Sequence, residues 1–219
     1  MSSSIRTDLK ILVVGHSATG KTSFVKRWTK NEFKDDYKPT IVSEFGFKIH
    51  EANGKFYRVQ LWDIGGQDKT SSSMAKIFSR DSHGCVVISD ATNIETLKNT
   101  LKWKELVSNE SNFIDGDKLP FILVQNKIDL IENKEDFDKV EDETKNIYEN
   151  NSFEKYFMTS VKQNINVGEA MNFLIGIIIN RLEKFAERGN IVFNEQKQRE
   201  TIKIETRESV RKKEEKKCC

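Results

Sequence analysis

Short apolar runs alternate along the chain with longer segments whose apolar residues recur at a spacing of three and four. The runs are rich in β-branched and aromatic residues, which is typical of buried strands. They lie at 11–14, 56–62, 85–89 and 121–124, with weaker candidates at 44–52 and 155–160. The helical pattern is clearest at 173–185, and another helix is predicted to begin near Asn93. Strands that alternate with helices predict an α/β fold in which a mostly parallel sheet is covered on both faces.

Asn53-Gly54 lies between two of these runs and has the residue types of a two-residue hairpin turn, so one strand is expected to be antiparallel. After about Arg188 few apolar residues remain, and almost every other position is charged or carries an amide. Such a segment cannot bury enough apolar surface to order itself alone. We therefore expect a folded domain over 7–185 and a mobile tail over 186–219.

Charge and cysteine content narrow the class of protein. The chain has 36 basic and 34 acidic residues, a balance that argues against binding nucleic acid through a basic field. No window of about 18 apolar residues predicts a membrane-spanning helix, the first residues lack the apolar core of a secretory signal, and Ser2 excludes N-myristoylation. Three cysteines offer no disulfide framework, so a reducing compartment, the cytosol, is expected.

The segment "GHSATGKT" at 15–22 follows the first strand directly and opens a helix, the context in which G-x-x-x-x-G-K-[ST] binds phosphates. Gly15 and Gly20 permit a tight turn that directs backbone N–H groups at phosphate oxygens. Lys21 can reach the β- and γ-phosphates of a nucleotide, and Thr22 can offer its hydroxyl to Mg²⁺. A chance glycine-containing turn is the alternative, and the strand–loop–helix context disfavours it.

A second motif, "WDIGGQ" at 62–67, suits the γ-phosphate and the metal. Asp63 ends a strand and is placed to hold Mg²⁺ through its water shell. The backbone N–H of Gly66 can meet the γ-phosphate, and Gln67 can orient an attacking water. D-x-x-G alone is a weak signal, but a phosphate loop about forty residues upstream makes it a strong one.

The segment "NKID" at 126–129 ends a buried-looking strand and suits a guanine base. The Asp129 carboxylate can accept from both N1–H and the 2-amino group of guanine, which adenine does not offer there. Asn126 is expected to tie this segment to the phosphate loop, and Lys127 to lay its aliphatic stem on the base. "TSVK" at 159–162 would complete the pocket through backbone N–H groups.

These motifs, together with "PT" at 39–40, occur in the order and spacing of Ras-like small GTPases, and the resemblance covers about 7–185. It implies a P-loop NTPase-type small G domain: a six-stranded, mostly parallel sheet with one antiparallel strand and about five helices. Within the superfamily the chain resembles the Rab proteins in "IVSEF" at 41–45, in "YRVQLWD" at 57–63 and in its two final cysteines. "LWDIGGQ", "SNFIDGDKLP" and "QNINVGEA" are further similar to the Rab branch that serves lysosome-related organelles.

The resemblance implies a role for each residue of the site. Thr40 would bind Mg²⁺ through its hydroxyl and the γ-phosphate through its N–H, Phe33 would stack edge-on against guanine, and Tyr37 would close over the phosphates. The implied residues that bind GTP or GDP are Gly15, Ser17, Ala18, Thr19, Gly20, Lys21, Thr22, Ser23, Phe33, Tyr37, Thr40, Gly66, Asn126, Lys127, Asp129, Ser160, Val161 and Lys162. The implied metal ligands are Thr22, Thr40 and Asp63, the catalytic residues Gln67, Lys21 and Gly66, the effector surface Ile41, Phe45, Trp62 and Phe78, and the lipidation sites Cys218 and Cys219.

The resemblance also implies a switch, in which GTP orders two loops that effectors read and hydrolysis releases them. No arginine is obviously placed to act in cis, so slow intrinsic hydrolysis and a GTPase-activating protein that supplies charge in trans are expected. The other implied partners are a guanine-nucleotide exchange factor, effectors, a GDP-dissociation inhibitor and a prenylation escort. Double geranylgeranylation of the final cysteines would anchor a monomeric protein on the cytoplasmic face of intracellular membranes, from which it cycles with the cytosol.

Departures from the Rab pattern leave alternatives open. Ile64-Gly65, Lys69-Thr70 and Ser71–Ser73 replace commoner residues of the second switch, either through neutral drift or with altered partner choice and a looser GTP state. The three aromatic residues of the implied effector surface could instead belong to the core.

Besides a switch in vesicle traffic, two other functions are possible. The chain could be a GTP-bound scaffold with negligible hydrolysis, but Gln67 argues against this function. It could also be an ATP-using phosphotransferase, but Asp129 argues against that one.

Overall fold

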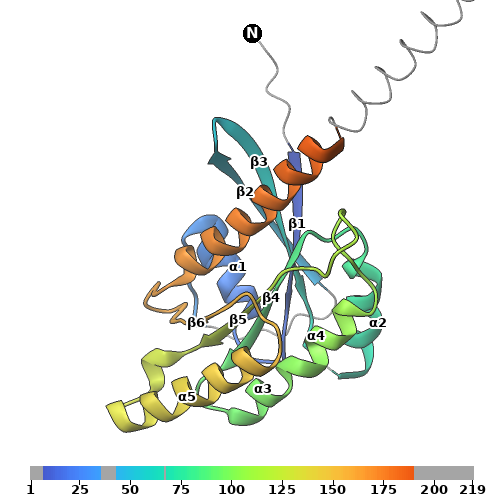
Figure 1. Ribbon diagram of the computed structural model, residues 1–219. Helices are drawn as coiled ribbons and strands as arrows, with labels where there is room; N and C mark the ends of the chain where they lie inside the picture. The colour runs from blue at the N-terminus through green and yellow to red at the C-terminus, as the bar shows by residue number, and fades with distance from the viewer. Residues whose placement is uncertain (1–6, 36–42, 67, 190–219) are drawn as a thin grey trace, which may run out of the picture. The chain divides into compact units, whose positions relative to one another are not determined.

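The computed structural model describes residues 7–35, 43–66 and 68–189, with the backbone alone at 68–72 (Figure 1). Its strands are β1 (Thr7–Val14), β2 (Ser43–Ala52), β3 (Lys55–Ile64), β4 (Gly84–Asp90), β5 (Phe121–Asn126) and β6 (Lys155–Met158). Its helices are α1 (Lys21–Lys30), α2 (Asp68–Ser79), α3 (Ile94–Lys98), α4 (Thr100–Ser108) and α5 (Lys134–Asn150), with a 3-10 turn at Ile128–Leu130 and a last helix over 167–189. Every strand predicted from the sequence is therefore present.

The strands form one sheet in the order β2-β3-β1-β4-β5-β6. All neighbours are parallel except β2 and β3, which run antiparallel. Asn53 (φ 53°) and Gly54 (φ 68°) are both left-handed, the backbone that a two-residue type I′ hairpin requires. The predicted mostly parallel, six-stranded sheet with one antiparallel strand is confirmed.

Helices lie on both faces of the sheet, as the register of the strands shows. Gly46 pairs with Leu61, and a Cβ on Gly46 would lie 2.9 Å from Val25 of α1. The next residue of β3, Trp62, points to the opposite face, where its ring lies 5.2 Å from that of Phe78 in α2. This is the arrangement that alternating strands and helices predict.

The predicted number of helices is confirmed once α3 and α4 are counted together. Asn99 separates them, but its backbone is still helical (φ −70°, ψ −13°), so they form one interrupted helix. Sequence periodicity did not indicate α5, because Thr144 is the one residue of this 17-residue helix that is fully buried. The N-cap residue before the helix is Asn133, whose side chain accepts a hydrogen bond from the Asp136 N–H.

The chain divides into a first compact unit that ends at Ile178 and a second that begins at Ile179. The described part of the second unit is helical and covers 179–189. The predicted boundary between a folded domain (7–185) and a tail (186–219) stays a prediction.

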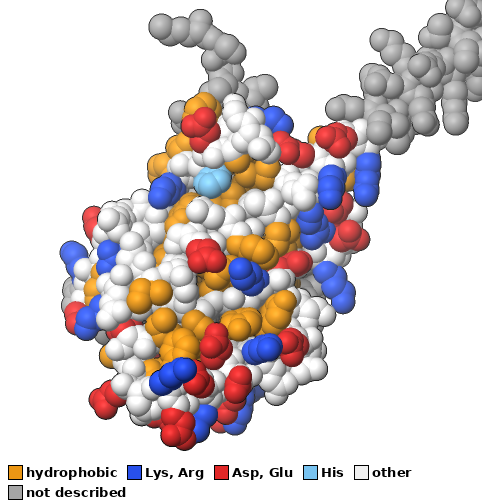
Figure 2. All heavy atoms as spheres, turned by 60° about the vertical axis from the view of Figure 1, so that its left-hand side comes forward, with side chains coloured by type: hydrophobic (Ala, Val, Ile, Leu, Met, Phe, Trp, Pro, Cys, Tyr) orange, Lys and Arg blue, Asp and Glu red, His pale blue; other side chains and the backbone are white. Residues whose placement is uncertain are grey.

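The surface mixes charge and apolar groups. On the face that Figure 2 shows, acidic and basic side chains are interspersed, and hydrophobic side chains lie between them. Among the described residues, no helix is both long and apolar enough to cross a membrane.

The edge strand β2 carries a row of exposed apolar side chains. Phe45, Phe47 and Ile49, 53%, 55% and 38% exposed, alternate along the strand on one face, and we call them the β2 row.

Candidate functional site

The loop between β1 and α1 is packed so closely that two of its positions require glycine. Gly15 (φ 146°) and Gly20 (φ 94°) have left-handed backbones. A Cβ on Gly15 would lie 2.1 Å from the Ile88 carbonyl oxygen, and one on Gly20 would lie 2.5 Å from Asn126 Nδ2. The loop is thus held against the carboxyl ends of β4 and β5, the edge of a parallel sheet at which ligands bind.

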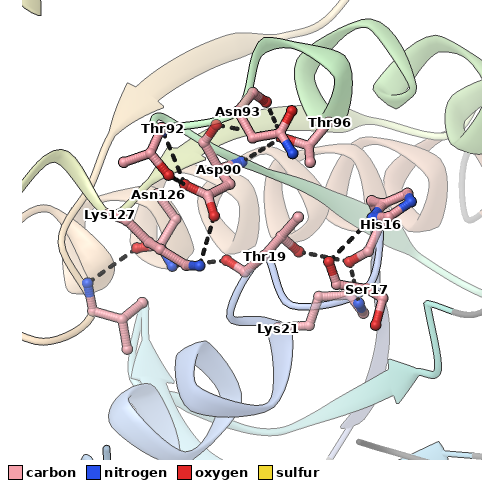
Figure 3. Close-up of polar contacts among 11 residues, drawn as sticks. His16, Ser17, Thr19, Lys21, Asp90, Thr92, Asn93, Thr96, Asn126 and Lys127 are labelled. Atoms are coloured by element: carbon pink, nitrogen blue, oxygen red, sulfur yellow. Dashed lines mark hydrogen bonds and ion pairs between the residues drawn. The ribbon is translucent and has the colours of Figure 1, made fainter. Parts of the chain in front are cut away.

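The interior of this loop is polar and cationic (Figure 3). Lys21 is 6% exposed, and its Nζ donates to the His16 carbonyl at 2.8 Å, as Thr19 Oγ1 also does at 3.0 Å. Burial lowers the pKa of Lys21 to about 8, although the nearby Asp63 carboxylate raises it in part. No described side chain caps the N-terminus of α1 at Gly20, and a helix N-terminus is a favourable place for an anion.

Beside the lysine lies a buried carboxylate with a free oxygen. Asp63 is fully buried; its Oδ2 accepts a hydrogen bond from Thr22 Oγ1, and its Oδ1 has no hydrogen-bond partner among the described residues. Burial raises the pKa of Asp63 to about 6, which Thr22 and Lys21 partly counteract. A buried carboxylate oxygen next to a hydroxyl is a donor set that fits Mg²⁺. Thr40, the third implied ligand, lies outside the described residues.

The segment after β3 reaches the phosphate loop at Gly66. A Cβ there would lie 2.5 Å from Ser17 N and 2.7 Å from Lys21 Nζ, so only glycine allows this approach. The backbone of Gly66 is thereby placed where a terminal phosphate bound to Lys21 would lie within reach. Gln67, the implied catalytic residue, lies outside the described residues.

Asn126 joins three segments at the other end of the site (Figure 3). Its Nδ2 donates to the Thr19 carbonyl at 2.9 Å, which ties β5 to the phosphate loop as the sequence predicts. Its Oδ1 accepts from the Val161 N–H at 3.1 Å and from Thr159 Oγ1 at 3.3 Å. One buried amide therefore sets the relative positions of the phosphate loop and the segment 159–162.

Asp129 lies where a base-recognising carboxylate is needed. Its Oδ1 accepts a hydrogen bond from Ser160 Oγ at 2.5 Å. Ser160 Oγ in turn accepts a hydrogen bond from the Gln163 N–H at 3.0 Å. Asp129 lines the same cleft as the phosphate loop. Ser160, itself held by the backbone, thus orients the Asp129 carboxylate.

The sequence did not single out Asp90, which ends β4 at the same edge of the sheet. Its Oδ2 pairs with Lys127 Nζ at 2.6 Å, while its Oδ1 accepts from the Thr92 N–H and hydroxyl at 2.9 and 2.8 Å (Figure 3). Lys127 has a left-handed backbone (φ 68°), and the ion pair with Asp90 holds the end of its side chain. The position of Asp90 directly after a buried apolar strand was the signal that could have found it.

These elements enclose a cleft of about 510 Å³, within the range of small-molecule sites. Of the residues implied by the resemblance, the cleft is lined by Ser17, Ala18, Gly20, Lys21, Thr22, Ser23, Phe33, Gly66, Asn126, Lys127, Asp129, Val161 and Lys162. Gly15, Thr19 and Ser160 lie behind its wall, and Tyr37 lies outside the described residues. The pair Lys26–Glu44, 3.3 Å apart, also lines the cleft and was not predicted.

A separate aromatic cluster lies on the α2 side of the sheet. The rings of Phe45 and Trp62 are 5.4 Å apart, and those of Trp62 and Phe78 are 5.2 Å apart. Lys10 Nζ lies 5.1 Å from the Trp62 ring. Because Phe45 is 53% exposed, the cluster is open to solvent and is not core. Ile41, Cys218 and Cys219 lie outside the described residues.

Comparison with known proteins agrees with this geometry. The family model described as "Ras family" matches residues 10–180. "Ras-related protein Rab-7L1" of Rattus norvegicus is 36% identical over 172 residues, which is 78% of this chain and 82% of that protein. "Ras-related protein Rab-32C" of Dictyostelium discoideum is 35% identical over 190 residues (87% and 82%), and "Ras-related protein Rab-32" of Homo sapiens is 31% identical over 199 residues (90% and 87%).

A loop of the phosphate-binding type, a buried carboxylate beside its lysine and a second carboxylate in the same cleft, all at one edge of this sheet, are the features of a nucleotide-binding G domain. The chain belongs to the Ras family, and within it to the Rab-type small GTPases. As a member of this family it binds guanine nucleotide, hydrolyses GTP and is a small GTPase of membrane trafficking.

Proposed function

We propose that this protein is a switch of vesicle traffic, whose GTP form recruits effectors to a membrane and whose slow hydrolysis of GTP ends that recruitment. One observation carries the proposal: a single cleft is lined by Lys21 and Thr22 at one end, with the buried Asp63 behind Thr22, and by Asp129 at the other, while Asn126 is hydrogen-bonded to the phosphate loop. The cleft therefore suits both the phosphates and the base of one nucleotide.

At the phosphate end, Lys21 and the N-terminus of α1 would neutralise the β- and γ-phosphates. Thr22, Thr40 and Asp63 would hold Mg²⁺, which when bound neutralises charge that develops during phosphoryl transfer. Gln67 would orient the attacking water, and the Gly66 N–H would bind the γ-phosphate. The fit of Gly66 against Lys21 supports this arrangement.

At the base end, the Asp129 carboxylate would accept two hydrogen bonds from guanine, while Ser160 Oγ donates to its Oδ1 and so holds it in place. The stem of Lys127 would cover one face of the base and Phe33 would contact it at the edge of the cleft. Backbone groups of Val161 and Lys162 would complete the pocket.

Effectors would bind at the exposed cluster of Phe45, Trp62 and Phe78, together with Ile41. Phe78 belongs to α2, and α2 follows Gly66, the proposed contact to the γ-phosphate. The bound nucleotide would therefore control how this cluster packs. An exchange factor, a GTPase-activating protein, a GDP-dissociation inhibitor and a prenylation escort complete the proposed cycle. Geranylgeranyl groups on Cys218 and Cys219 would provide the membrane anchor, because two lipid chains give stable attachment where one is marginal.

The test is single-turnover hydrolysis of preloaded GTP by the full chain beside Gln67→Leu and Asp129→Asn. We expect a rate on the order of 10⁻⁴ s⁻¹, as for Ras itself, and a further fall with Gln67→Leu. Asp129→Asn should shift preference from guanine toward xanthine nucleotides, because the amide offers a donor to the xanthine 2-oxygen. Cleavage by the unaltered protein that equals Gln67→Leu would instead favour a GTP-bound scaffold.

A further inference from the structure

We propose that Arg27 is a positioning residue that holds both flanks of the guanine end of the cleft together and thereby slows nucleotide release. The inference rests on the proposed guanine-nucleotide function and concerns a residue that touches neither phosphate motif. Arg27 lies in α1, and two of the groups that it binds, the carbonyls of Val161 and Lys162, belong to residues that line the cleft.

Arg27 binds the segment that follows β6. Its Nε donates to the Val161 carbonyl at 2.9 Å, and its Nη2 donates to the Lys162 carbonyl at 3.0 Å. Two parallel donors of one planar guanidinium thus bind two successive carbonyls, a geometry that lysine cannot reproduce. The Asn31 carbonyl and Oδ1 accept from Nη1 at 3.2 and 3.3 Å, which fixes the guanidinium at the end of α1.

The same guanidinium supports the opposite flank of the cleft. Its carbon lies 5.8 Å from the centre of the Phe33 ring, and Phe33 lines the cleft. Lys162 Nζ lies 3.7 Å from Asp35 Oδ2, which joins the two flanks a second time. Arg27 is therefore the point at which the Phe33 flank and the 161–162 flank meet.

The consequence follows from the bonds of Val161, which is 2% exposed. Its N–H is bound to Asn126 Oδ1 and its carbonyl to Arg27 Nε, so both polar groups of this residue are held by different elements. Without Arg27, two carbonyls lose charge-assisted hydrogen bonds and Phe33 loses its cationic support. The flanks can then separate, and the base is released more readily although the phosphate contacts remain.

The experiment compares Arg27→Gln and Arg27→Lys with the unaltered protein, and uses Arg58→Gln as a matched control. Arg58 is also a bidentate arginine, but it binds Asp8 on the exposed sheet surface. Dissociation of fluorescent GDP in excess Mg²⁺ is measured by displacement, together with the ratio of affinities for GDP and IDP. IDP lacks the 2-amino group, so the ratio reports how well the base is held and does not respond to general loss of stability.

We expect GDP to leave Arg27→Gln about tenfold faster and the preference for GDP over IDP to fall by about threefold. Arg27→Lys should lie between, and Arg58→Gln should match the unaltered protein. If Arg27→Gln does not fold, Arg27→Lys carries the same test. Unchanged release and an unchanged ratio in the Arg27 variants would overturn the inference alone, whereas an unaltered protein that binds no GDP would overturn the proposed function.

Discussion

Asp63 combines a pKa that burial raises with an oxygen, Oδ1, that has no hydrogen-bond partner among the described residues. Because its pKa rises from 3.8 to about 6 in the folded protein, the charged carboxylate destabilises the metal-free fold above pH 6. That cost begins to fall as pH drops below 6, where the folded state takes up a proton, and is gone only below about 3.8, where the unfolded state is protonated as well. A metal bound at Oδ1 would remove the same cost at neutral pH.

The isosteric change Asp63→Asn should therefore raise the melting temperature of the metal-free protein above pH 7. The gain should shrink as pH falls below 6, because the unaltered carboxyl is then neutral as well. Thermal unfolding in EDTA between about pH 4.5 and 8 measures the difference, with Glu95→Gln, an exposed carboxyl paired with Lys98, as control. A gain that is the same at every pH would contradict the proposed cause.

Asp90 is expected to act through Lys127. Asp90→Asn preserves an acceptor oxygen for the hydrogen bonds from Thr92 but removes the negative charge that holds Lys127 Nζ at 2.6 Å. GDP should dissociate several-fold faster, because the lysine stem is then no longer held against the base. Stopped-flow displacement of fluorescent GDP measures the rate. Wild-type release by Asp90→Asn, with faster release by Lys127→Ala, would show that the pair is not needed.

Whether the sequence predicted a site residue depended on how far along the chain the partners of that residue lie. Gly15, Gly20 and Lys21 act within one short loop, so their spacing alone predicts their roles. Arg27 meets carbonyls 134 and 135 positions away, which no local pattern reveals. Asn126 was predicted to reach the phosphate loop only because its motif had been recognised.

At the scale of elements, strands were easier to predict than helices. β4 and β5 are buried at every position, so each appears in the sequence as a continuous apolar run. α5 lacks a clear apolar stripe because it buries so little, and its one tyrosine, Tyr148, contacts β6, where the Tyr156 ring lies 5.4 Å away. Burial, rather than length, decided what was predictable.

Close packing between β4 and the last helix gives a prediction for Gly84. A Cβ there would lie 2.8 Å from Ile178 Cδ1 and 3.2 Å from Leu174 Cδ1. Gly84→Ala should lower the free energy of unfolding by about 1–3 kcal/mol, because the helix must shift or its side chains must change rotamer. Chemical denaturation of the GDP-bound protein measures this.

Gly176→Ala is the matched control, since Gly176 lies in the same helix with nothing within 4 Å of the added methyl group. It should be neutral or stabilise by up to about 1 kcal/mol, because alanine favours the helix. Equal destabilisation by both changes would show that helix propensity, and not contact with β4, explains the Gly84 result.

At the scale of the whole molecule, the cleft lies between the phosphate loop, Gly66 after β3, the end of β5 and the segment after β6, so a ligand there contacts widely separated parts of the chain. Binding to the folded state alone should stabilise all of them together, by about 4 kcal/mol at a thousandfold excess over the dissociation constant. We expect Mg²⁺ with GDP to raise the melting temperature and removal of both to lower it. An equal rise with ATP would contradict guanine selectivity.

The β2 row has a consequence for the behaviour of the purified protein. These apolar side chains lie on an edge strand, and no described strand pairs with its outer side. Exposed edges of this kind template strand-to-strand aggregation, which Lys48 and Glu51, exposed along the same strand, only partly oppose. Concentrated stocks should therefore lose monomer through β2 during storage, and a bound partner that covers the row should lengthen their shelf life.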